Sequence, residues 1–74
     1  MRASDVIVID CNIMSGTPCF RGTRVPVSTL FDNLADDMSV DEILESWPTL
    51  NRADVMAVLS LAGERLVEEA KAAA

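Results

Sequence analysis

Arg21 and Arg24 are the residues whose type and spacing most suggest chemistry, because two guanidinium groups can grip one anion. They lie in a loop rich in glycine and proline, residues 16–27, whose backbone amides can also point at a phosphate. The loop lacks the spacing of a P-loop, so nucleotide binding has little support. The alternative partners are three carboxylates that would clamp the loop to the next helix: Asp10, Asp32 and Asp36. We favour this structural role for at least one arginine.

Cys19 lies near these arginines and is the other candidate for chemistry in the loop. A nucleophilic cysteine normally needs a general base such as histidine, and the sequence contains none. We therefore predict that Cys19 is a small loop or core residue. Cys11 is the other cysteine, and two cysteines are too few for a disulfide framework or a structural zinc site.

Carboxylates cluster around the middle of the chain, at Asp36, Asp37, Asp41, Glu42 and Glu45. Acid–base catalysis would require a shaped cleft and perturbed pKa values, whereas helix capping and solvation require neither. We therefore predict capping and solvation for these carboxylates. The sequence indicates no catalytic residue, no metal ligand set and no cofactor, and we expect that the protein is not an enzyme.

The composition predicts one small acidic domain that covers residues 1–74. Hydrophobic residues make up 50% of the chain, which excludes a disordered composition. No apolar run is long enough for a membrane span or a signal peptide, so we expect a cytoplasmic location. The net charge of −6 is concentrated in residues 27–74, which indicates a basic protein partner or simply solubility, and argues against a large nucleic-acid footprint.

The hydrophobic periodicity predicts a mainly α fold with short N-terminal β strands. A β-branched run at residues 6–9 predicts a strand, and the residues on either side of Gly22 can add further short strands. Apolar residues at helical spacing predict three helices, at residues 27–36, 40–47 and 52–71. Short connections between them predict a compact tri-helical unit of the helix-turn-helix kind.

Local residues set the helix ends. Ser39 and Glu42 have the spacing of a capping box, which predicts the start of the second helix. Pro48 disfavours helical angles at Trp47 and ends that helix. Trp47 lies on the apolar stripe, so we predict a core anchor rather than a stacking platform.

The last helix is long for a domain of this size. Its main apolar stripe is predicted to comprise Val55, Leu59, Ala62 and Leu66. A weaker second face consists of Met56, Gly63 and Val67. A helix with two apolar faces is a candidate surface for self-association or for a partner.

Three segments of the chain carry a family resemblance. They read Gly16-x-Pro18-x-x-Arg21-Gly22-Thr23-Arg24-Val25-Pro26-Val27, Ser39-x-x-Glu42-Ile43-Leu44-x-x-Trp47-Pro48-x-Leu50 and Asp54-Val55-x-Ala57-x-Leu59. In this order and spacing they resemble the domain of unknown function 433 (DUF433), over roughly residues 5–68. Trp47 stands where members of this family usually carry Tyr or Phe, which keeps a large aromatic before the proline.

The resemblance implies a fold similar to winged-helix or homeodomain-like helix-turn-helix domains. It also implies an antitoxin-like role, because members of the family are often proposed to neutralise a PIN-like nuclease. We therefore expect a homodimer that binds such a nuclease and can weakly bind its own promoter DNA. The partner-binding residues are predicted on the acidic face of the last helix: Glu64, Glu68 and Glu69.

The alternative hypothesis is a stand-alone helix-turn-helix regulator that binds DNA. The helix after Pro48 would then enter the groove. The basic residues of such a regulator that would contact DNA are predicted to be Arg21, Arg24 and Arg52. Neutralisation of phosphates by basic residues supplies much of the affinity for DNA. Since the chain has few basic residues, we favour the protein-binding role over this alternative.

Overall fold

The computed structural model describes residues 2–10 and 14–73 of the chain. Its elements in order are η1 (Ala3–Asp5), β1 (Ile7–Val8), η2 (Met14–Gly16), β2 (Cys19–Phe20), α1 (Val27–Ala35), α2 (Val40–Ser46) and α3 (Arg52–Ala73). The fold is mainly helical with a small N-terminal sheet, as the sequence predicted. Predicted and observed helix ends differ by at most two residues.

The N-terminal sheet is antiparallel, with Ile7 opposite Phe20 and Val8 opposite Cys19. After β2 the chain turns back on itself, and the Phe20 amide donates to the carbonyl of Val25 at 3.0 Å. Gly22 occupies this turn with φ +78, a conformation that glycine adopts at little cost. The glycine- and proline-rich loop is therefore a tight hairpin that leads directly into α1.

Side chains cap the two C-terminal helices. The Ser39 hydroxyl accepts from the Glu42 amide at 3.2 Å, and Glu42 Oε1 accepts from the Ser39 amide at 3.0 Å, so the predicted capping box is confirmed. Asn51 caps α3 in a similar way, since its Oδ1 accepts from the Asp54 amide at 2.8 Å. These caps hold α2 and α3 around the short turn between them.

The core lies where the three helices meet the hairpin. Its buried residues are Val6, Phe20, Val25, Leu30, Ile43, Leu50, Val55 and Val58. Trp47 packs against this core from its margin, which agrees with the predicted anchor. Phe20 and Leu30 are fully buried, so the hairpin and α1 are fixed to each other by apolar packing.

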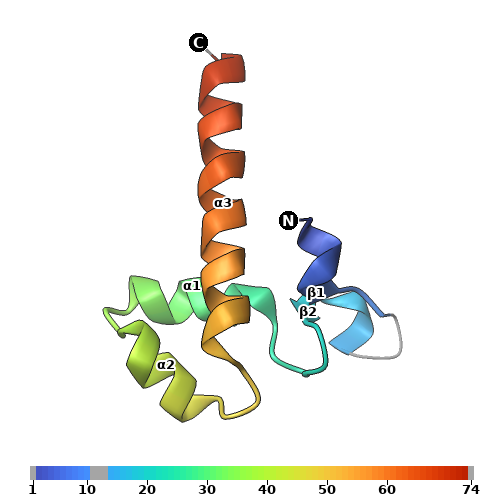
Figure 1. Cartoon of the computed structure of the whole chain (residues 1–74), viewed down its shortest axis with the longest axis vertical. Coiled ribbons are helices and arrows are strands. Elements are labelled where there is room, and N and C mark those ends of the chain that lie inside the picture. Colours follow the sequence, from blue (N-terminus) through green and yellow to red (C-terminus); the bar gives the residue numbers. More distant parts are fainter. Residues whose placement is uncertain (1, 11–13, 74) are drawn as a thin grey trace.

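The C-terminal half of α3 extends well beyond the rest of the molecule (Figure 1). No residue of this half is buried, and residues 63–73 are all exposed; we call them the α3 arm. Leu66 belongs to the predicted main apolar stripe, and 66% of its surface is exposed. Periodicity identifies the apolar face of a helix, not the point where the body beneath it ends.

Candidate partner-binding groove

An open groove of about 530 Å³ lies where the N-terminal segment, α1 and α3 come together. Its floor is apolar and consists of Ala3, Ile7, Val27, Phe31, Val58, Leu61 and Ala62. Its rim is charged and consists of Glu64, Arg65 and Glu68. Such a groove, with an apolar floor and a charged rim, has the character of a surface that receives an amphipathic segment.

Phe31 forms the part of the floor that α1 contributes. It follows Leu30, which points into the core, so the helical turn places Phe31 at the margin of the buried face. Phe31 is 37% exposed and adjoins the other apolar residues of the floor, so its exposed part belongs to a continuous apolar surface. The groove therefore presents an aromatic side chain that the folded chain does not fully cover.

Two of the three predicted partner-binding glutamates line the groove. Glu64 and Glu68 are four residues apart and both line the groove. Glu69 lies outside the groove lining, and its Oε1 is 3.9 Å from Nε of Arg65. Glu64 and Glu68 are thus the acidic pair of the rim, and Arg65 is its basic member.

The three predicted basic residues are held by different parts of the molecule. Arg21 donates through Nη2 to the carbonyl of Ser4 at 2.6 Å, so it ties the hairpin to the N-terminal turn. Arg52 forms an ion pair with Asp41 and ties α3 to α2. Arg24 lines a second hollow, which is also lined by Trp47.

Two of the carboxylates considered from the sequence do not pair with the loop arginines. Among residues 2–10 and 14–73, neither Arg21 nor Arg24 forms an ion pair with Asp32 or Asp36. Arg21 nevertheless makes a structural contact, because its guanidinium donates to a backbone carbonyl, that of Ser4.

Cys19 is buried, and its thiol donates to the carbonyl of Thr17 at 3.3 Å. This agrees with the predicted core position. Cys11 lies outside the described residues. Within the described ranges, no three histidine, cysteine or carboxylate residues are grouped to hold a metal ion.

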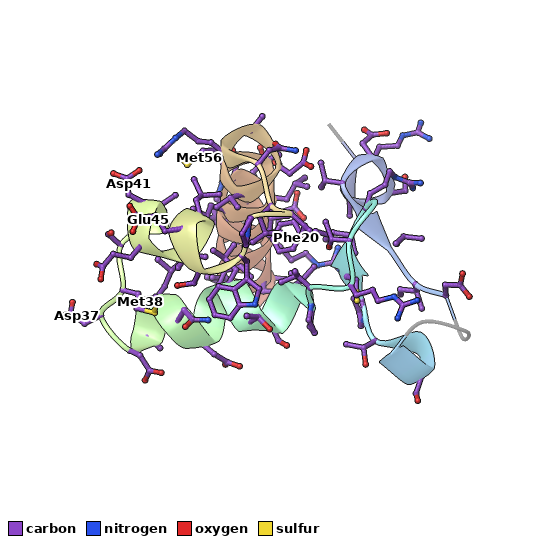
Figure 2. All side chains as sticks on the ribbon, turned by 90° about the horizontal axis from the view of Figure 1, so that it is seen from below. Phe20, Asp37, Met38, Asp41, Glu45 and Met56 are labelled. Carbon is purple, nitrogen blue, oxygen red and sulfur yellow. The ribbon has the colours of Figure 1, made fainter. Side chains whose placement is uncertain are left out.

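The acidic residues of the middle region lie at one outer edge of the molecule, where Figure 2 shows Asp37, Asp41 and Glu45 around the α1–α2 turn. All three are exposed, and Asp41 is occupied by its ion pair with Arg52. They line none of the hollows described above.

In the part of the chain that the structure describes, no helix has the length and apolarity that crossing a bilayer requires.

The groove was not predicted from the sequence, because its floor is assembled from three separate segments. Each segment contributes an apolar residue at the margin of its own buried face, such as Ile7, Phe31 and Leu61. The sequence signal that could have indicated the groove was an apolar stripe on each helix that is wider than the core can cover. Only the packing of the helices shows that these margins adjoin.

The fold and the groove together define a small, mainly helical module with an open apolar surface. Within this class, the chain belongs to a family of proteins of unknown function, DUF433, whose model matches residues 7–62. The matched region contains the hairpin, the three-helix body and most of the groove floor.

A curated relative is the "Uncharacterized protein y4eO" of Sinorhizobium fredii (strain NBRC 101917 / NGR234). It is 41% identical over 49 residues, which cover 66% of this chain and 22% of the relative. The chain thus spans less than a quarter of the length of that protein. No solved structure matches this chain.

Proposed function

We propose that this protein is an antitoxin-like module that binds a PIN-like nuclease and suppresses it. The groove between the N-terminal segment, α1 and α3 is the binding site in this proposal. The observation that carries it is the combination of an exposed aromatic floor at Phe31 with an acidic pair on the rim, Glu64 and Glu68.

Charge complementarity selects the kind of partner. The chain carries a net charge of −6, and the rim has two carboxylates against one guanidinium group. A segment with apolar side chains on one face and Lys or Arg on the other would satisfy both floor and rim. A nuclease surface that binds nucleic acid is rich in such basic groups, so occupying it would also block the substrate.

The alternative, a stand-alone DNA-binding regulator, has less support from the geometry. A basic side chain that contacts phosphate must be available, and Arg52 and Arg21 are engaged with Asp41 and Ser4. The first turn of α3 also carries Asp54, whose carboxylate would approach a phosphate unfavourably. Weak promoter binding by a dimer remains part of the proposal as a secondary activity.

The test uses the full chain and a purified PIN-like nuclease encoded beside it. A double charge reversal, E64K and E68K, should raise the dissociation constant by about tenfold or more, because two rim attractions become repulsions. The matched control is D36K with E45K, which makes the same change in net charge at exposed residues outside the groove. The control should bind within about twofold of the wild type.

Two results would contradict the proposal. The first is that the wild-type chain neither co-purifies with the nuclease nor lowers its activity on mixing. The second is that the control pair weakens binding as much as the rim pair does. In that case net charge, and not the groove, would govern the interaction.

A further inference from the structure

Helix α3 carries an apolar line that runs from its anchored half into the α3 arm, on the side that faces away from the groove. Its members are Met56, Leu59, Gly63, Leu66 and Ala70, which we call the α3 seam. They are spaced alternately three and four residues apart, which is the repeat of a helix that packs along another helix. Met56 is 50% exposed and Leu66 is 66% exposed, whereas Leu59 is half-buried against the core. The body of the same chain therefore leaves the seam open on both sides of Leu59.

An unsupported helical arm needs a partner. Isolated helices shorter than about 12–15 residues are marginal in water, because most helix stability in proteins comes from packing of an apolar face. The only side-chain ion pair described in the arm is Arg65 with Glu69 at 3.9 Å, on the exposed surface. That pair contributes little.

Gly63 lies at the centre of the seam and has no explanation within one chain. Glycine in a helix interior is unfavourable relative to alanine. A Cβ atom at this position would meet nothing within 4 Å. The space beside Gly63 is therefore open, and a second helix can approach the backbone closely at this position.

We propose that two copies of this chain pair through their α3 seams, antiparallel and about a two-fold axis near Gly63 and Leu66. In this arrangement Leu66 of each copy packs over Gly63 of the other. Val67, which is 53% exposed, flanks the contact. A specific interface buries about 1,000 Å² or more in total, so the two seams must be in contact along most of their length.

Electrostatics select the antiparallel orientation. Asp41 lies beside the base of the seam, since it pairs with Arg52 one helical turn before Met56. A parallel pair would bring the acidic α2 edges of both copies together, including Asp41 and Glu45 (Figure 2). An antiparallel pair separates these edges and places the arm of each copy against the anchored half of the other helix.

The seam and the groove occupy different sides of α3. Gly63 and Arg65 are two residues apart, which places them about 160° apart around the helix, roughly opposite. A second copy on the seam therefore leaves the groove open. The pairing goes beyond the proposed nuclease binding and does not depend on it.

The test measures the oligomeric state of the full chain alone, by sedimentation equilibrium over a concentration series. The wild type should be a dimer, and L66E should raise its dissociation constant roughly 100-fold, because each interface loses two buried leucines and gains two charges. G63Q should act in the same direction by filling the central contact. The matched control, E68Q, changes the opposite side of the arm and should leave the constant within about twofold.

Leu66 makes no buried contact within the chain, so the L66E monomer should remain folded, as judged by cooperative thermal unfolding. A wild-type chain that stays monomeric, or an L66E chain that stays dimeric, would overturn the pairing. Orientation is tested with A70C in a C11S background, where Cys19 is buried. Antiparallel pairing places the two introduced thiols about 16 Å apart along the axis, too far for a disulfide. Rapid oxidation to a covalent dimer would overturn the antiparallel arrangement.

Discussion

Truncation of the chain after Gly63 separates the three-helix body from the α3 arm. Every buried core residue precedes this point, the last being Val58. We therefore expect the truncated chain to fold as a monomer. Its free energy of unfolding should be close to that of a full-length variant that cannot dimerise. It should lose nuclease binding, because Glu64 and Glu68 leave with the arm.

The expected cost follows from the contacts that truncation removes. Arg65 and Glu69 form one exposed pair four residues apart, which is worth about 0.2–0.5 kcal/mol. Arg65 and Glu68 also line the groove, and their stems cover a small part of its apolar floor. No buried apolar side chain is lost, so the free energy of unfolding should fall by less than about 1 kcal/mol.

The assay is urea unfolding followed by the fluorescence of Trp47, which lies at the margin of the core and far from the truncation in sequence. The correct reference is L66E, which keeps the arm but removes the proposed dimer contact. This choice excludes the stabilisation that self-association gives to the wild type. Far-UV circular dichroism of the two chains should differ only by the helical signal of the arm.

A loss of more than about 2 kcal/mol relative to L66E would refute the reasoning, since a change that large requires buried contacts. It would mean that the arm packs on the body and is not a free surface. Retention of nuclease binding by the truncated chain would separately place the binding site away from the Glu64 and Glu68 rim.

Two further predictions concern the helix ends on either side of the α1–α2 turn. D37G should raise the free energy of unfolding by about 0.5–1 kcal/mol, because Asp37 has φ +68 at the end of α1, where glycine is favoured. Chemical denaturation measures this change in the free energy of unfolding. S39A should lower the free energy of unfolding by about 1 kcal/mol, because the backbone amide of Glu42 in α2 loses its side-chain acceptor. S46A, at the other end of α2, is the control and should change little; equal effects of S39A and S46A would contradict the capping argument.

The fold was predictable to the extent that local residues decide it. Ser39 and Asn51 define helix starts through hydrogen bonds to residues three positions later, so both starts could be located from sequence. The turn at Gly22 and the flanking extended residues were predictable for the same reason, because glycine permits the positive φ that the hairpin requires.

The candidate site was predictable only in part, because it depends on contacts between distant segments. Helical spacing groups Glu64 with Glu68, and both line the groove, whereas Glu69 lies outside the lining and beside Arg65. The contact of Arg21 with the Ser4 carbonyl could not be foreseen, since a backbone acceptor leaves no trace in the side-chain pattern. The exposure of Leu66 depends on the size of the body, which periodicity does not report.

The length of α3 connects the two proposals. The body needs only the first half of this helix, which contributes the buried residues Val55 and Val58. The second half adds Glu64 and Glu68 to one side and Leu66 to the opposite side. A two-fold pair through the seam stabilises both arms and, in doing so, fixes the rim of each groove in a helical conformation. Dimerisation would therefore lower the entropic cost of binding a partner without contributing a contact to it, because the rim would already be ordered when the partner arrives.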